Sequence, residues 1–209
     1  MVHGCSSRFS VQLAVDHGLK CPNGGNLIER HNEIRDLAGQ LASLAFSHVT
    51  REPVVREPGT GDSSECGLVC DLAVRGAWQP QTEALIDFRV CNTDAQSYAN
   101  RPVMAVLDSI AKSKKAKHRQ ACWERRADFT PFVISTDGIV QREGEHFLKR
   151  LASRLADKWT KSYSDTMRFI RTQFSIAVLR ATDHCIRGAR RKMQPLHCED
   201  GAAIPLFSV

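Results

Sequence analysis

Apolar residues recur at helical spacing in four long stretches of the chain and alternate with polar residues, or cluster briefly, in four shorter ones. Apolar positions three to four residues apart indicate amphipathic helices, whereas alternation indicates strands with one buried face. The helices are expected over about 27–46, 103–126, 143–159 and 164–186, and the strands over 48–55, 68–75, 83–91 and 131–135. The chain is therefore predicted to be an α/β protein.

These elements follow one another as helix, three strands, helix, strand and further helices. The α-β-β-β-α-β order is that of the restriction-endonuclease-like core, here with extra C-terminal helices. Order alone says little about function, because one fold can carry many activities.

Composition indicates an intracellular protein. No apolar run approaches the roughly 20 residues that cross a bilayer, and the first residues lack a signal-peptide pattern. The eight cysteines are scattered along the sequence. We therefore expect free or buried thiols rather than a disulfide framework, and no membrane partner.

Charge is distributed unevenly along the chain. Residues 1–100 carry 8 Lys and Arg against 12 Asp and Glu, whereas residues 101–209 carry 21 against 11. A basic half of this kind suits a polyanion, so DNA is the expected partner and RNA the alternative. Solvated helix surfaces give similar charge runs, and charge alone does not separate the two interpretations.

Two aspartates stand at a suggestive spacing in neighbouring predicted strands. If residues 68–75 and 83–91 form a hairpin symmetric about Gln79, Asp71 lies directly opposite Asp87. Facing side chains of such a pair are about 4.5–5.5 Å apart at Cβ. Carboxylates at that separation can hold one Mg²⁺ or Mn²⁺ ion, as phosphodiester cleavage requires. A slipped hairpin register, or two solvated aspartates with Arg89 as a counter-ion, would leave no metal site.

Four other residues are candidates for the same chemistry. Arg89 follows Asp87 where the nuclease pattern Asp/Glu-x-Lys has lysine, and an arginine holds phosphate but shuttles protons poorly. Lys114 or Lys115 in the next helix could supply the ammonium group instead. Glu33 is a candidate third metal ligand, although an acidic residue near the start of a helix also favours that helix.

The first 25 residues contain a possible zinc site. His3, Cys5, His17 and Cys21 are four ligand-type residues within a short segment that ends in Pro-Asn-Gly-Gly. Zinc binds such nitrogen and sulfur ligands tetrahedrally, and so short a piece would need the ion to fold. Their spacing is not one of the common zinc patterns, so accidental cysteines and histidines are the alternative.

Several segments together resemble a known family. The sequence is similar to the zinc knuckle and restriction-like endonuclease that follow the reverse transcriptase in LINE-type retrotransposon proteins. The matching segments occur in the same order and span most of residues 3–190: 16–25, 30–37, Cys-Asp-Leu-Ala at 70–73, Ile-Asp-Phe-Arg-Val at 86–90, 129–135 and 185–190.

The resemblance implies an enzyme that nicks target DNA to prime reverse transcription. It places Asp71 and Asp87 on the two metal-binding positions, Lys114 or Lys115 near a helix-borne lysine, and the four Cys/His residues on a zinc knuckle. The chain departs from the family pattern at His3, where a cysteine is expected, and at Cys70, where a proline is usual. The stretch between Cys5 and the second histidine is also about four residues longer than the pattern.

We expect four parts in the chain. Residues 1–25 would form the zinc-knuckle-like segment, 26–138 the nuclease core, 139–190 a basic helical extension and 191–209 a flexible tail without periodicity. Such a domain would normally be fused to a reverse transcriptase and would act in the nucleus without a small-molecule cofactor. An orphan copy that binds nucleic acid without cutting it, or a reading frame with no selected function, is the alternative.

Overall fold

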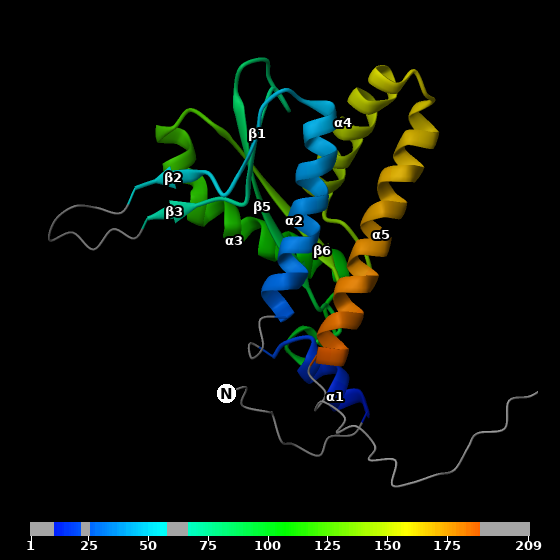
Figure 1. Ribbon diagram of the computed structural model, residues 1–209. Helices are drawn as coiled ribbons and strands as arrows, with labels where there is room; N and C mark the ends of the chain where they lie inside the picture. The colour runs from blue at the N-terminus through cyan, green and yellow to red at the C-terminus, as the bar shows by residue number, and fades with distance from the viewer. Residues whose placement is uncertain (1–10, 22–25, 58–66, 189–209) are drawn as a thin grey trace, which may run out of the picture.

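The computed structural model describes residues 11–21, 26–57 and 67–188 and shows a mixed α/β fold. Figure 1 shows a central sheet flanked by long helices. The α/β class is as predicted. The expected tail, 191–209, and two of the expected zinc ligands, His3 and Cys5, lie outside the described residues. In the described part of the chain, no helix is long and apolar enough to cross a membrane.

A four-stranded mixed sheet in the order β1-β4-β5-β6 forms the centre of the molecule. The first three strands are antiparallel neighbours: β1 (Val49–Arg51), β4 (Leu72–Arg75) and β5 (Glu83–Cys91). The fourth, β6 (Asp128–Ser135), runs parallel to β5. Parallel neighbours need a crossover connection, and α3 (Val103–Glu124) supplies it.

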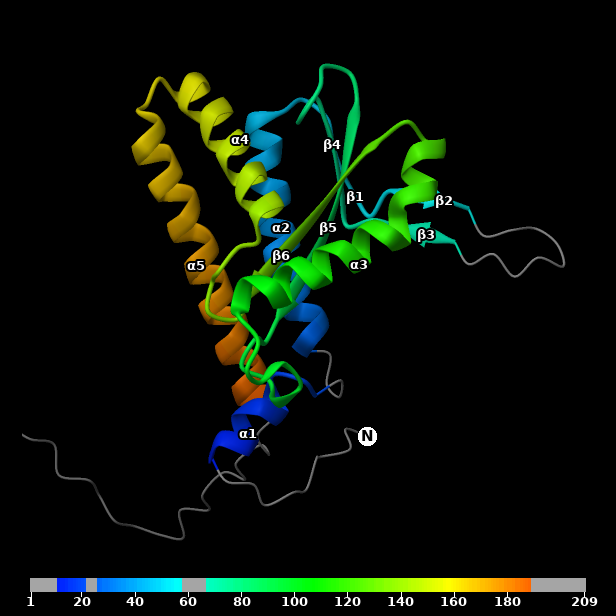
Figure 2. The same ribbon diagram turned by 180° about the vertical axis from the view of Figure 1, so that it is seen from behind.

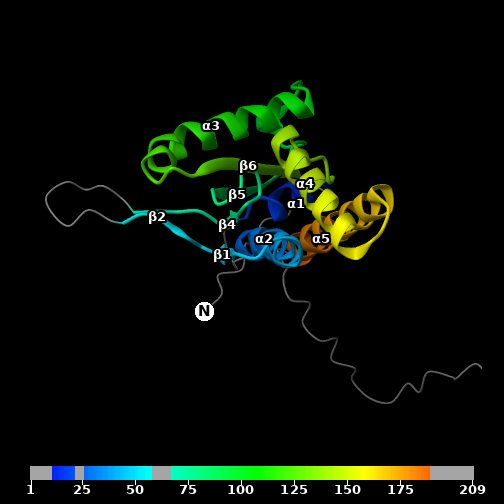
Figure 3. The ribbon, with the colours of Figure 1, turned by 90° about the horizontal axis from the view of Figure 1, so that it is seen from above.

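The helices cover both faces of this sheet. Seen from above, α3 lies on one side, while α2 (Asn26–Ala45), α4 (Arg142–Trp159) and α5 (Tyr163–Gly188) lie on the other (Figure 3). The described residues also form two short helices, α1 (Val11–Gly18) and the 3-10 helix η1 (Gln96–Tyr98). The sequence pattern did not indicate α1.

Two expected strands are each divided in two. The 48–55 segment forms β1 and then β2 (Val54–Arg56), and the 68–75 segment forms β3 (Leu68–Val69) and then β4. The first break falls at Glu52, whose φ is 50°, and at Pro53, which has no N–H to donate. β2 and β3 pair with each other as a separate two-stranded sheet, which projects from the central one (Figure 1).

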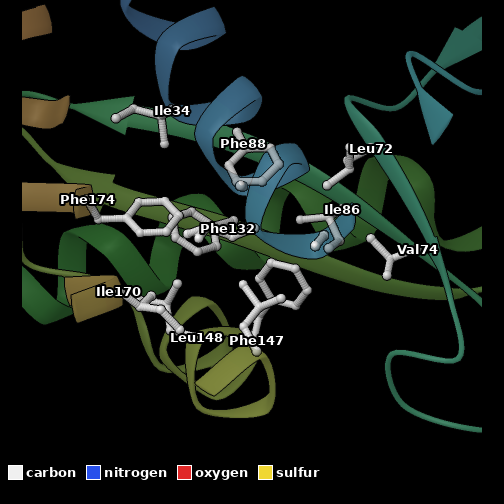
Figure 4. Close-up of a cluster of buried hydrophobic side chains, with 14 of the residues drawn as sticks. Ile34, Leu72, Val74, Ile86, Phe88, Phe132, Phe147, Leu148, Ile170 and Phe174 are labelled. Atoms are coloured by element: carbon white, nitrogen blue, oxygen red, sulfur yellow. The ribbon is translucent and has the colours of Figure 1, made fainter. Parts of the chain in front are cut away.

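The main hydrophobic core lies between the sheet and the three helices α2, α4 and α5. Leu72, Ile86 and Phe88 from the strands pack there with aromatic residues that include Phe132, Phe147 and Phe174 (Figure 4). The expected extension 139–190 therefore contributes α4 and α5 to the same core as the strands. The boundary expected at residue 138 does not separate two cores, because these helices bury the apolar face of β5 and β6.

Candidate active site

Asp71 and Asp87 meet at the start of the β4–β5 hairpin. The paired residues of β4 and β5 run from Arg75 and Glu83 to Leu72 and Ile86, and one further step in this register brings Asp71 opposite Asp87. The hairpin register inferred from the sequence is thus confirmed. The chain bends at Asp71, immediately before β4, so this aspartate is a neighbour of β5 without being a member of the regular ladder.

The Asp71 carboxylate is held by the two elements on either side of it. Its Oδ2 accepts a hydrogen bond from the Phe88 backbone N–H at 2.5 Å. Its Oδ1 lies 2.9 Å from Nε2 of His31, which α2 presents. The Asp71 side chain is only 17% exposed. With both oxygens engaged, the carboxylate is fixed in orientation.

The Asp87 carboxylate is held by residues of α3. Its Oδ2 accepts a hydrogen bond from Nζ of Lys114 and lies 3.4 Å from Nε2 of His118. Burial raises the pKa of Asp87, but hydrogen bonds with His118, Lys114 and the Asp71 carboxyl, together with the charge of Lys114, outweigh burial and hold the pKa well below its usual value. Asp87 is therefore ionised at neutral pH.

His118 links this pair to Cys70. Nδ1 of His118 lies 3.4 Å from the Cys70 Sγ, and the His118 ring stacks on Phe129 with centroids 4.6 Å apart. A cysteine beside a histidine resembles a nucleophile with its base. However, Cys70 is 1% exposed, and burial with the nearby Asp87 charge raises the pKa of its thiol to about 12. Cys70 is therefore a packed thiol and not a nucleophile.

The structure brings one of the two candidate lysines to the carboxylates. Lys114 contacts Asp87, whereas Lys115, the next residue of α3, forms an ion pair with Glu143 of α4 at 2.8 Å. Adjacent helical residues point about 100° apart, so only one of the two can face β5. The contact with Asp87 therefore makes Lys114, and not Lys115, the candidate lysine of the site.

Within the described residues, neither Glu33 nor Arg89 forms an ion pair with the two aspartates. Glu33 accepts a hydrogen bond from Arg180 of α5, with Oε1 2.9 Å from Nη2, and is therefore engaged by that helix. Arg89 is exposed and, within the described residues, forms no ion pair with either aspartate. The counter-ion of the pair is therefore Lys114 and not Arg89, and the two aspartates are largely buried rather than solvated.

The donor set suits a hard divalent cation. Asp71 and Asp87 lie side by side and together carry four carboxylate oxygens. Mg²⁺ is commonly bound by one or two carboxylates with waters and substrate phosphates. Among the residues that the structure describes, no group of three or more His, Cys, Asp or Glu side chains is arranged to hold a metal ion. Within the described residues, a metal here would thus use Asp71 and Asp87, with waters and substrate phosphates as further ligands.

Sequence reasoning assigned no role at this site to His118. The spacing of His118 from Lys114 could have indicated this role, because residues four apart share one face of a helix such as α3. His31 joins the site from α2, where its Nε2 contacts Oδ1 of Asp71. Of the expected zinc ligands, Cys21 is a buried free thiol and His17 is part-buried in α1.

Comparison with known proteins assigns no family. No family model matches the chain, and no curated protein matches it. The retrotransposon resemblance stays a prediction, and function is argued from the site geometry.

Proposed function

We propose that this protein is a divalent-metal-dependent DNA endonuclease domain, with Asp71 and Asp87 as the ligands of Mg²⁺ or Mn²⁺. One observation carries the proposal: two largely buried carboxylates face each other across a hairpin with a lysine against one of them. Like charges directly opposite in a sheet are destabilising, and a divalent cation held between the two carboxylates would offset that repulsion.

The element order supports a restriction-endonuclease-like core. Helix α2, the strands of the central sheet, the crossover α3 and the parallel strand β6 follow one another in the expected sequence. The two carboxylates lie at the beginning of β4, and β5 extends past this point to Cys91. In this proposal, substrate approaches the carboxylates from the side of β5 that β4 leaves uncovered. In this proposal the domain descends from a LINE-type retrotransposon protein, in which it would follow a reverse transcriptase, and works on nuclear DNA.

Each side chain of the site has a distinct task. A bound divalent ion would polarise the phosphate and lower the pKa of an attacking water. Asp87, whose lowered pKa keeps it ionised, is ready to bind a cation without releasing a proton. His31 orients Asp71. With a cation bound to Asp87, the ammonium group of Lys114 would be free to contact the scissile phosphate.

Basic residues of α3 are the best-placed group to track the DNA backbone. Lys112, Lys117 and Arg119 are exposed and have no acidic partner among the described residues. The exposed indole of Trp123, 80% accessible at the end of the same helix, offers a stacking surface for a base. Figure 2 shows α3 running along its face of the sheet.

Helix α5, which also belongs to the basic half of the chain, is less available to DNA. Each of its four arginines forms an ion pair with an acidic residue: Arg168 with Asp165, Arg171 with Glu145, Arg180 with Glu33, and Arg187 with Asp183. Paired arginines have less charge to offer phosphates, so we assign the DNA-binding surface to α3.

Nicking of supercoiled plasmid tests the proposal. The wild-type protein with Mg²⁺ or Mn²⁺ should convert the plasmid to the open circle, EDTA should stop the reaction, and Asp87→Ala should abolish it. Asp137→Ala, in an exposed turn, is the matched control and should cut like the wild type. Thermal melting of both variants checks that they are folded.

Binding without cutting would favour the second candidate, a nucleic-acid-binding module that has lost catalysis. The observation on its side is that every charge of the carboxylate pair already has a partner within the protein. Salt-dependent DNA binding with no nicking under either metal would identify the module. Failure to bind DNA at low salt would contradict both functions.

A further inference from the structure

A small pocket adjoins the carboxylate pair on its α2 side. It has a volume of about 300 Å³ and lies between the start of α2, the end of β5 and η1. His31, the residue that holds Asp71, is part of its wall. Arg89 also lines it, two residues beyond Asp87 along β5, which is a distance of about 6.6–6.8 Å.

A buried arginine that has no acidic partner among the described residues lines this pocket. Arg30 is 6% exposed, and its Nε makes no hydrogen bond within the described residues. Its one hydrogen bond there runs from Nη1 to the Leu19 carbonyl, with a length of 3.4 Å. Arginine is almost never fully buried unless it is paired, and burying an uncompensated charge is costly. The guanidinium of Arg30 is therefore a candidate anion-binding group.

The rest of the wall is consistent with an anion. Lys20 and Arg89 add two further cations, and none of the lining residues is acidic. Burial lowers the pKa of Arg30, and the neighbouring charge of Arg89 lowers it further. A bound anion would offset both effects. Asn92, 8% exposed, contributes an amide Nδ2 that also lacks a partner in the described part of the chain.

We propose that this pocket binds a phosphate group through Arg30, Arg89, Lys20 and the Asn92 amide. Guanidinium groups match the oxygens of phosphate and can donate two parallel hydrogen bonds. Under the proposed function, on which this inference rests for its source, the group is a phosphate of the DNA strand held beside Asp71 and Asp87. A terminal phosphomonoester would satisfy the same donors, so the test separates the two.

Side-chain NMR in EDTA, without divalent metal, tests the proposal. The Arg30 Nε–H signal is followed during titration with inorganic phosphate and with a short single-stranded oligonucleotide, once with a 5′-phosphate and once without any terminal phosphate. The signal should move in at least one titration. Movement with the unphosphorylated oligonucleotide identifies a backbone phosphate, and movement with the other two probes alone identifies a terminal one.

Replacing the two exposed cations keeps the test independent of Arg30 and of folding. Arg89→Gln combined with Lys20→Gln should weaken binding of the active probe about tenfold or more, since the two substitutions remove charge-assisted hydrogen bonds to the phosphate. The matched control, Arg142→Gln with Lys149→Gln on α4, removes two exposed cations outside the pocket and should bind like the wild type.

Two results would overturn the inference: an Arg30 Nε–H signal that no probe moves, or equal weakening by the pocket pair and the control pair. Both are distinguishable from failure of the proposed function, which is scored by plasmid nicking with metal. Phosphate binding without nicking would support the phosphate pocket and contradict the endonuclease proposal. Nicking with no change in the Arg30 signal would support the endonuclease proposal and contradict the phosphate pocket.

Discussion

The carboxylate of Asp87 is charged in surroundings that oppose its charge. It is 13% exposed, and its ionised form persists because Lys114 and His118 lie against one of its oxygens. A buried carboxylate stabilised in this way links proton binding to folding. Its contribution to stability is present above the pKa of the unfolded chain and is lost as the pH falls toward the lowered pKa of the folded state.

Asp87→Asn should therefore make the protein less sensitive to acid. The wild type should lose stability as the pH falls below the ordinary carboxyl pKa of 3.8, and the variant should lose less over the same interval because its amide does not titrate. Urea denaturation at a series of pH values from 6 to 2.5 measures the difference between the two proteins. Parallel curves for both would contradict the assigned ion pair.

Cys70 should be almost unreactive in the folded protein. The thiolate is the nucleophilic form, and a pKa of about 12 leaves very little of it at pH 8. Mass spectrometry after brief exposure to iodoacetamide should find this residue unmodified in the native state and modified in urea. Rapid native labelling of Cys70 would show that the contact with His118 is open in solution.

Lys114 and Lys115 contact different acidic residues, and this difference allows a test of the site within the single helix α3. Lys114→Gln should abolish or strongly reduce nicking, because it removes the ammonium group that faces Asp87, whereas Lys115→Gln should cut like the wild type since its partner is Glu143. The rate of plasmid nicking with Mg²⁺ measures both. Equal loss in both variants would point to a general charge effect on DNA binding.

Two helical glycines differ in what a methyl group would meet. A Cβ at Gly144 in α4 would lie 2.8 Å from Val140 Cγ1 and 3.3 Å from the buried Phe132 ring, whereas at Gly39 in α2 the nearest atom, Leu72 Cδ1, is at an ordinary 3.4 Å. Gly144→Ala should lower the free energy of unfolding by about 1–3 kcal/mol through overpacking. Gly39→Ala should leave it unchanged or raise it by up to about 1 kcal/mol. Urea denaturation compares them.

Predictability from sequence differed among the elements for physical reasons. The alternation in 83–91 gave the whole of β5, and symmetry about Gln79 gave its register with β4. The break between β1 and β2 depends on the positive φ of Glu52 and on a second sheet, neither of which alternation encodes. Lys114 could not be chosen over Lys115 without the helix orientation, which tertiary packing sets.

At the scale of the whole molecule, the distribution of free and paired basic residues separates two surfaces. Replacing Lys112, Lys117 and Arg119 of α3 by Gln should weaken DNA binding and reduce its salt dependence by about 0.9 in logarithmic slope for each DNA phosphate that is no longer neutralised. The same replacement at Arg168, Arg180 and Arg187 of α5 removes equal charge and should have a smaller effect. Fluorescence anisotropy at several salt concentrations checks both, and equal slopes for the two triple variants would contradict the assignment to α3.

The crossover between the parallel strands also bears on how the chain folds. The β4–β5 hairpin joins neighbours through residues 76–82 and is a local structure, but by itself it sets two carboxylates face to face without a cation. Pairing of β5 with β6 closes a much longer loop, a step that is slow because entropy is lost before contacts form. That step also delivers Lys114 and His118 to Asp87. The repulsion within the hairpin is thus relieved only when the crossover docks, which ties the completion of the site to the cooperativity of the fold.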